Sequence, residues 1–318
     1  MILQLIKKII KEKFALYLLF NYLMTNNVKG IILALIASFC AVLMSVFLKF
    51  AQEDASVFSV GFLRFFFGFI IILPFILKSK FKIYKTDNLK FHITRSIINV
   101  PMMILGFAAL MYIPLDQIKA IGFLSPILVV ILSVIFLKER IYLIRTASLI
   151  LGFIGVIIIL RPGYIPISVG SYMVLTSTLL WSTVIIITKY MSKSDSPMTI
   201  ICYQYTFVSL FTLPLAIVYW TNLSVSSVFY SFMAAIVGTI LHLCINHSYK
   251  LSSLTILQPV WFSQLLWATV FSLILFNESV DFYTYLGGSL VFISVLVITY
   301  RENYLKKDIT KNSIPVKN

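Results

Sequence analysis

Long apolar stretches, separated by short polar segments, run along most of the chain. A helix that crosses the hydrocarbon core of a bilayer needs about 20 mostly apolar residues, and several stretches come close to that length. We expect ten spanning helices, over residues 29–50, 57–77, 95–113, 117–137, 142–160, 168–188, 198–220, 227–250, 254–276 and 281–300. The connections between them are too short for a separate soluble domain. The pattern predicts an all-α polytopic membrane protein with ten transmembrane helices.

The composition agrees with this class. Of the 318 residues, 60% are hydrophobic and 12% are charged, whereas charged residues make up about a quarter of a soluble domain. The net charge of +15 raises the alternative of a nucleic-acid-binding protein. The basic residues lie in the connections and tails, however, without a basic face interleaved with aromatic side chains. We therefore expect a lipid bilayer as the environment of this chain, and no nucleic acid as its partner.

The distribution of Lys and Arg predicts an orientation, because loops that face the cytoplasm are enriched in both. With the N-terminus inside, the inside segments hold 22 of the 26 Lys and Arg, six of them in residues 78–95. Lys49, Lys119 and Arg161 fall outside, and Arg64 lies within a span. We expect the N- and C-termini in the cytoplasm.

The two ends of the chain are basic. Residues 1–28 hold an apolar stretch that lysines interrupt, and residues 304–318 form a basic cytoplasmic tail. The N-terminal segment has no obvious small-residue cleavage site, so we do not interpret it as a signal peptide. It stays open whether this segment is an amphipathic surface helix or precedes a native start at Met24.

An internal repeat is indicated by pairs of landmarks at one near-constant spacing. Lys49 and Lys189, in VFLKF and IITKY, are 140 residues apart, as are Pro74 and Pro214, while Glu139 and Glu278 are 139 apart. Such a spacing predicts a duplication, with repeats over residues 29–163 and 164–303. Each repeat holds five spans, so the second enters the membrane from the opposite side. Inverted repeats are typical of secondary transporters, whose substrate site lies between the repeats near the midplane.

Three elements carry a family resemblance: GFLRFFFGFIIILPF (61–75), FLKER (136–140) and LGFIGVIIILRPG (151–163). With the two five-span halves, they make residues 29–303 resemble the drug/metabolite transporter superfamily in its ten-span EamA-type branch. The resemblance implies a carrier in the bacterial inner membrane that moves a small metabolite by alternating access. It implies no ATP hydrolysis, and the sequence contains no G-x-x-x-x-G-K-[ST] loop.

Other elements favour one group within that superfamily. HITR (92–95), LSPILVVILSVIFLKE (124–139) and FNESVD (276–281) are similar to the S-adenosylmethionine uptake carriers of obligate intracellular bacteria. This resemblance implies S-adenosylmethionine uptake as the best assignment. Substrates diverge widely within one fold, so an exporter of amino acids, drugs or other metabolites is the alternative.

Arg64 is the first candidate for substrate binding, because an ionisable residue within a span usually faces the bundle interior or a wet cavity. It either pairs with Glu53, Asp54 or a carbonyl to fix a helix, or lines the cavity and attracts an anionic group such as a substrate carboxylate. Its counterpart 140 residues further on is Gln204, so the repeat keeps a polar residue there and loses the charge.

Other polar or aromatic residues within spans are also candidates. His242 and Asn246 share one helix face; Asn99 precedes Pro101, which can kink its helix. For each, packing or interhelical hydrogen bonding is the alternative to a place in the cavity. The candidate substrate-binding residues are Arg64, Asn99, Trp181, Tyr203, Gln204, His242, Asn246, Gln258 and Gln264.

Some residues are expected to build the scaffold. Gly152 and Gly155 in the fifth span, and Gly287 and Gly288 in the tenth, let helices approach closely. Glu139 and Glu278 end the fourth and ninth spans, where they either cap helices or form gate ion pairs. The cysteines, Cys40, Cys202 and Cys244, have neither metal-ligand nor disulfide spacing, so we expect them to pack as small apolar residues.

An enzyme is the rival class. A membrane-embedded enzyme needs a metal or nucleophile constellation, and the sequence has no H-E-x-x-H, no paired aspartates within a span and no G-x-S-x-G. We expect no catalytic residue, no metal and no cofactor. Proton coupling through a histidine, exchange down a gradient, the direction of transport and a homodimer all stay open.

Overall fold

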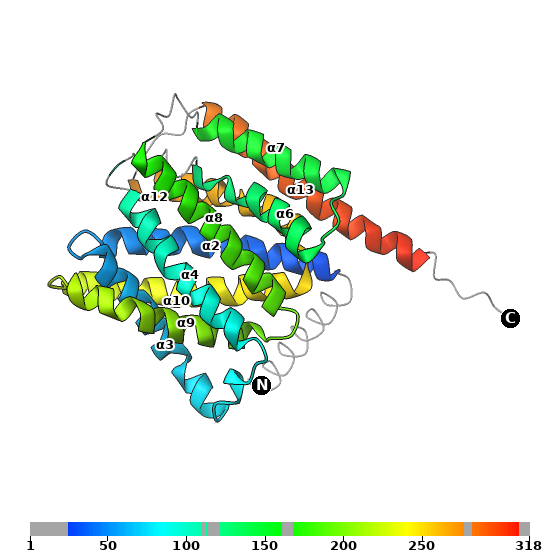
Figure 1. Cartoon of the computed structure of the whole chain (residues 1–318). Helices are drawn as coiled ribbons and strands as arrows, with labels where there is room; N and C mark the ends of the chain where they lie inside the picture. The colour runs from blue at the N-terminus through cyan, green and yellow to red at the C-terminus, as the bar shows by residue number, and fades with distance from the viewer. Residues whose placement is uncertain (1–24, 110–111, 113–120, 161–167, 277–281, 312–318) are drawn as a thin grey trace, which may run out of the picture.

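The computed structural model describes residues 25–109, 112, 121–160, 168–276 and 282–311. The secondary structure of the described residues is helical, with no strand among them (Figure 1). The elements are α2 (Asn26–Ala51), α3 (Val57–Lys78), η1 (Lys82–Tyr84), α4 (Leu89–Ala108), α6 (Ser125–Leu137), α7 (Leu143–Leu160), α8 (Val169–Met191), α9 (Pro197–Val218), α10 (Val225–Leu251), α11 (Leu254–Trp261), α12 (Gln264–Phe276) and α13 (Phe282–Lys311).

Every predicted span overlaps a helix, although several bounds differ. The third helix begins at Leu89, six residues before the predicted start. The ninth predicted span is divided into α11 and α12. Among the described residues, the helices long and apolar enough to cross a membrane are α2, α3, α8, α9, α10 and residues Tyr285–Glu302 of α13. The chain is thus an all-helical membrane protein.

Serine or threonine residues fix where several helices begin. The side-chain oxygen of Ser56, for example, accepts a hydrogen bond from the backbone nitrogen of Ser59 and satisfies one of the free N–H groups of the first turn of α3. The N-cap residues with such a bond are Thr25, Ser56, Ser168, Ser196 and Ser224. These caps define helix starts, at which an apolar segment follows a polar one.

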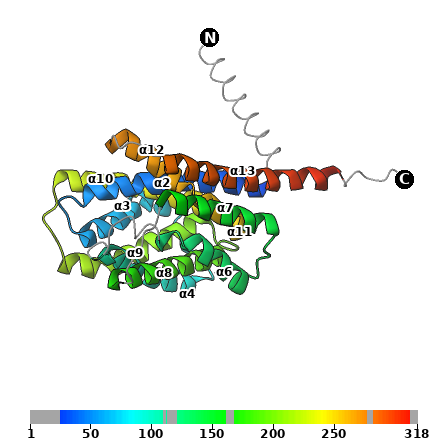
Figure 2. The ribbon, with the colours of Figure 1, turned by 90° about the horizontal axis from the view of Figure 1, so that it is seen from above.

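The helices pack in pairs along a flattened bundle (Figures 1 and 2). α2 lies along α10, α3 along α9, α4 along α8 and α7 along α13. α6 contacts both α8 and α11, while α11 also contacts α2. The elements on either side of each contact come from different predicted repeats, so the two halves interleave.

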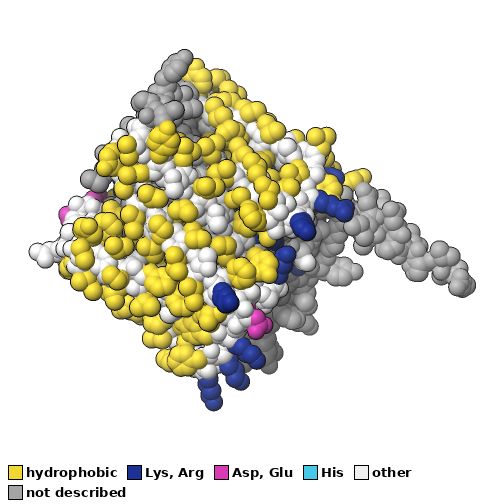
Figure 3. All heavy atoms as spheres, viewed as in Figure 1, with side chains coloured by type: hydrophobic (Ala, Val, Ile, Leu, Met, Phe, Trp, Pro, Cys, Tyr) yellow, Lys and Arg dark blue, Asp and Glu magenta, His cyan; other side chains and the backbone are white. Residues whose placement is uncertain are grey.

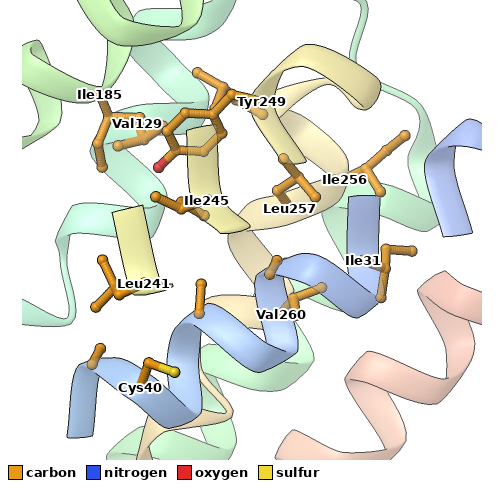
Figure 4. Close-up of a cluster of buried hydrophobic side chains, with 14 of the residues drawn as sticks. Ile31, Cys40, Val129, Ile185, Leu241, Ile245, Tyr249, Ile256, Leu257 and Val260 are labelled. Carbon is orange, nitrogen blue, oxygen red and sulfur yellow. The ribbon is translucent and has the colours of Figure 1, made fainter. Parts of the chain in front are cut away.

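An apolar cluster joins α2, α10 and α11 (Figure 4). Ile31 and Cys40 of α2 are buried against Leu241 and Ile245 of α10 and Val260 of α11. Cys40 thus packs as a small apolar residue, as predicted, and all three cysteines are free. Such close-packed contacts hold the helices together in a solvent whose lipid tails are equally apolar.

The α7–α13 pair depends on glycine. A Cβ atom on Gly155 would lie 2.6 Å from the backbone oxygen of Gly287, and one on Gly152 would lie 2.6 Å from the ring of Phe262. Neither distance is tolerated between non-bonded atoms, so glycine is required where α7 approaches α13 and where it approaches Phe262, which follows α11. The prediction of close packing at these glycines is confirmed.

Two turns interrupt helices in corresponding places. Phe123 and Leu124 form a turn just before α6 begins at Ser125, and Phe262 and Ser263 form a turn just before α12 begins at Gln264. The two helix starts are 139 residues apart. Pro259 lies near the second turn and leaves a backbone carbonyl without its helical donor.

Lysine and arginine side chains gather along one edge of the molecule, over the α3–α4 connection and the neighbouring helix ends (Figure 3). The rest of that face is covered by hydrophobic side chains. The exposed lysines of the α3–α4 connection are Lys78, Lys80, Lys82 and Lys85. We refer to this edge as the basic end.

Candidate functional site

A cavity of about 290 Å³ lies between the helices. Residues of α2, α3 and α4 line one part of it, and residues of α8 to α12 line the rest. The lining residues are Ala41, Met44, Ser45, Arg64, Phe65, Asn99, Met102, Trp181, Gln204, Leu241, His242, Trp261 and Gln264. Both predicted repeats therefore contribute to one cavity.

Four polar side chains form a hydrogen-bonded series at this cavity, which we call the cavity chain. The Arg95 Nη2 donates to Gln204 Oε1 at 2.9 Å. Gln204 Nε2 lies 3.4 Å from His242 Nε2, and Arg64 Nη2 lies 3.2 Å from the same ring nitrogen. Arg95, Gln204 and His242 are buried, while Arg64 is half-buried and lines the cavity.

The series defines the protonation of the imidazole. Gln204 Oε1 accepts from Arg95, so the amide NH2 of Gln204 faces His242. Guanidinium and amide nitrogens both donate, and both approach Nε2 of His242. That nitrogen must therefore accept, which makes His242 neutral with its proton on Nδ1.

The cavity chain contains two cations and no acid. Within the described ranges, the ion pairs are His92–Asp195 and Arg145–Glu302, and neither involves Arg64 or Arg95. The carboxylates considered as partners of Arg64 lie elsewhere: Glu53 and Asp54 are exposed, and Asp54 Oδ2 accepts from Ser224 Oγ at 3.2 Å. The structure gives Arg64 an imidazole neighbour in place of a carboxylate.

The sequence-predicted candidates divide into two groups. Those that line the cavity are Arg64, Asn99, Trp181, Gln204, His242 and Gln264. Tyr203 lies towards the basic end, where its hydroxyl donates to the Tyr84 carbonyl at 2.6 Å and its ring stacks on His92. Asn246 and Gln258 are buried but do not line this cavity. In the described part of the chain, Asn246 Nδ2 and Gln258 Oε1 have no hydrogen-bond partner.

Arg95 was missed by sequence reasoning. The orientation count includes it in the inside segment 78–95, at the boundary with the third predicted span, whereas the structure places it within α4, where it is 4% exposed. The cause is that α4 begins at Leu89, where the chain is still polar. A signal was present in HITR, because His92 and Arg95 are three residues apart and therefore share a helix face.

A second polar region joins helix ends at the basic end, and we call it the basic-end network. Each carboxylate of this network has a hydrogen-bond or ion-pair partner within the chain. Asp195 is 2.9 Å from His92 Nε2, and Glu302 is 3.1 Å from Arg145 Nε. Lys189 donates to the backbone carbonyls of Tyr249 and Ser252.

Glu139 belongs to the same network. Its carboxylate accepts from the backbone nitrogens of Leu254 at 3.0 Å and Thr255 at 3.1 Å, which caps the start of α11. Of the two alternatives for this residue, the structure has the helix cap. Its predicted counterpart Glu278 lies outside the described residues.

The described residues contain no group of three His, Cys, Asp or Glu that could hold a metal ion. A helical membrane protein with a polar cavity between its helices has the architecture of a small-molecule transporter. The model of the EamA-like transporter family matches residues 28–161 and 168–300, and the chain belongs to this family. It is therefore a multi-pass membrane transporter and not an enzyme.

Two named relatives are similar over most of the chain. The S-adenosylmethionine uptake transporter of Rickettsia prowazekii (strain Madrid E) is 24% identical over 87% of this chain and 93% of the relative. The riboflavin transporter of Vibrio cholerae serotype O1 is 25% identical over 77% of this chain and 83% of the relative. A solved crystal structure covers 87% of this chain and 98% of its own, with a TM-score of 0.74 at 12% identity, and shares the fold.

Proposed function

We propose that this protein is a secondary transporter that moves a small metabolite across the bacterial inner membrane by alternating access. The best substrate assignment is S-adenosylmethionine, taken up into the cell. The alternative is an exporter of amino acids, drugs or other metabolites with the same fold. The observation that carries the proposal is the polar cavity, which is lined from both halves of the chain.

Ten spans in two inverted repeats are part of the proposal. Exchanging each helix for its counterpart turns the α2–α10 contact into α8–α4, the α3–α10 contact into α9–α4 and the α6–α8 contact into α12–α2, and all of these contacts occur. The two matches of the family model and the two turns 139 residues apart support the same repeat. Two similar packings that exchange roles would open the cavity to either side in turn.

The cytoplasmic side is proposed to be the basic end. Its lysines and arginines are those of the segments that the positive-inside rule assigns to the cytoplasm. The basic-end network ties the two halves together there, for example through Glu139 and the start of α11. These contacts support a conformation closed towards the cytoplasm.

S-adenosylmethionine is proposed because its chemistry matches the cavity and because the Rickettsia relative carries that name. Trp181 and Trp261 line the cavity, and an indole offers a flat apolar face for a purine ring. Arg64 offers a cation for a carboxylate. The riboflavin relative has nearly the same identity, so riboflavin is the first competitor to compare.

The test is uptake of radiolabelled S-adenosylmethionine into cells that express the protein. We expect saturable uptake that excess unlabelled S-adenosylmethionine abolishes and that riboflavin leaves unchanged. Arg64→Ala is expected to lose uptake at equal membrane abundance, whereas Arg140→Ala, which removes an exposed arginine, keeps it. No uptake above empty-vector cells would reject this substrate and leave the transporter family in place.

A further inference from the structure

We propose that the cavity chain is a carboxylate-binding device, in which Arg64 binds the substrate and Arg95 positions Arg64 without touching the substrate. The inference rests on the proposed transport function and names its substrate class: a small molecule that carries a carboxylate and a flat ring. Arg95 is absent from the cavity lining, so its effect has to pass through Gln204 and His242.

The first step is the order of donors and acceptors. Arg95 can only donate, so it holds the oxygen of Gln204 and turns the amide nitrogen towards His242. His242 Nε2 is then an acceptor. The hydrogen bond that Arg64 Nη2 donates to it fixes one edge of that guanidinium. A guanidinium has five N–H donors, so most of the donors of Arg64 remain for a ligand.

The second step is charge. Two guanidinium groups share this interior, His242 between them is neutral, and no carboxylate of the described residues lies within ion-pair distance of either. Buried charges in proteins are usually paired, because removing an ion from water without a counter-ion is costly. The Nε atom of Arg95 has no hydrogen-bond partner in the described part of the chain. A ligand with an anionic group would supply the missing charge.

The third step is selection by shape. Arginine presents a planar fork that binds carboxylates in a bidentate manner, and the orientation of that fork decides whether both bonds form. Fixing the fork beforehand lowers the entropy lost on binding. A flat ring on the same ligand would reach the indoles of Trp181 and Trp261, which line the same cavity. Compounds without the carboxylate would keep the ring contact and lose the ionic one.

The experiment measures ligand binding to the purified full chain in lipid nanodiscs by thermal stabilisation and by tryptophan fluorescence. The probes are matched pairs that differ in the carboxylate: S-adenosylmethionine with decarboxylated S-adenosylmethionine, S-adenosylhomocysteine with its carboxamide, phenylalanine with phenylalaninamide, and indole-3-acetate with indole-3-acetamide. Riboflavin is the flat-ring probe without a carboxylate.

We expect at least one acid to bind at least 30-fold more tightly than its carboxylate-free partner. Partners that bind within threefold of their acids would overturn the inference, and so would a panel in which no acid binds. If neither member of the S-adenosylmethionine pair binds, but another acid binds more tightly than its neutral partner, the substrate assignment is rejected and the inference is supported. If the protein takes up S-adenosylmethionine but binds acids and neutral partners equally well, the substrate assignment is supported and the inference is overturned.

Variants separate binding from positioning. In Arg64→Ala, the acid should bind no more than threefold more tightly than its neutral partner. The affinity for the neutral partner should stay unchanged. Arg95→Gln should lower the affinity for the acid about tenfold and leave the neutral partner within twofold. Equal losses for both partners would reduce Arg95 to a structural role and overturn its positioning role. Arg140→Ala is the charge-matched control.

Two further variants guard against misfolding and test the order of the bonds. Arg95→Lys keeps a cation that can only donate, so it should keep more of the ratio of acid to neutral partner than Arg95→Gln does. Gln204→Glu places a carboxylate between Arg95 and His242, so the imidazole must donate from Nε2 and can no longer accept from Arg64. We expect the acid preference to fall in this variant as well; an unchanged preference would overturn the relay through His242.

Discussion

The cavity chain and the basic-end network both contain basic side chains, but only the network contains carboxylates that pair with them. In the network, Asp195 meets His92, Glu302 meets Arg145, and Glu139 meets two backbone N–H groups. In the cavity chain, Arg64 and Arg95 meet a neutral imidazole and a neutral amide. Charges that are satisfied within the chain hold helices together, whereas we propose that the charge of Arg64, which lines the cavity without a counter-ion, binds a ligand.

The largest expected effect on transport tests the cavity side of this comparison. Arg64→Ala should lower kcat/KM for uptake about 100-fold, or about 2.7 kcal/mol of transition-state stabilisation. The melting temperature of the purified protein should stay the same or rise, because even a half-buried cation without a counter-ion costs free energy. Radiotracer uptake and a thermal-shift assay on one preparation check both parts. A variant that melts much earlier would assign Arg64 to the scaffold.

The next effect tests the network side. Arg145→Ala leaves the carboxylate of Glu302, which is 2% exposed, without its cation, and we expect a loss of about 3 kcal/mol of stability. The KM for uptake should stay within twofold. The double variant Arg145→Ala/Glu302→Ala should recover part of that loss, since no unpaired charge remains. A double variant no more stable than the single one would contradict this account.

A smaller effect is expected at Asp195. Asp195→Asn removes the charge next to His92 but keeps an acceptor for Thr86, which now donates to the carboxylate at 2.9 Å. We expect a loss of about 2 kcal/mol, typical of hydrogen bonds to charged groups, in a denaturation experiment. Asp87→Asn, which changes a nearby exposed acid, is the matched control and should have little effect.

The smallest effect is expected at the start of α11. Glu139→Gln keeps one side-chain oxygen, so one of the two backbone N–H groups that Glu139 now binds loses its acceptor. Helix N-caps contribute about 1 kcal/mol, and the thermal-shift assay should detect a loss of that size. Glu53→Gln, at an exposed site, serves as the comparison. Equal melting temperatures for these two variants would mean that the cap is dispensable.

Hydropathy predicted where the helices lie, because the length of an apolar stretch is a local property. It did not predict the turn at Phe262–Ser263, since residues 254–276 are apolar across it and Pro259 alone marks the site. The start of α4 was also missed, because its first residues are polar and yet helical. Helix ends depend on caps and contacts that composition does not contain.

The cavity was predicted where a polar residue stands out against an apolar span, as Arg64, Gln204 and His242 do. Arg95 stands in a polar neighbourhood, and the one local signal that distinguishes it from a loop residue is its three-residue spacing from His92. Its partner Gln204 is 109 residues away. Only the packing of α4 against α9 reveals that the two residues meet.

The interrupted helices have a consequence for how the protein is made. α11 has 8 residues, α6 has 13 and α12 has 13, so at 1.5 Å per residue each is shorter than the bilayer core of about 30 Å. None of them is therefore long enough to span the bilayer alone. Since α6 contacts α11, which the ribosome makes more than 100 residues later, the centre of the protein can only be assembled late in translation.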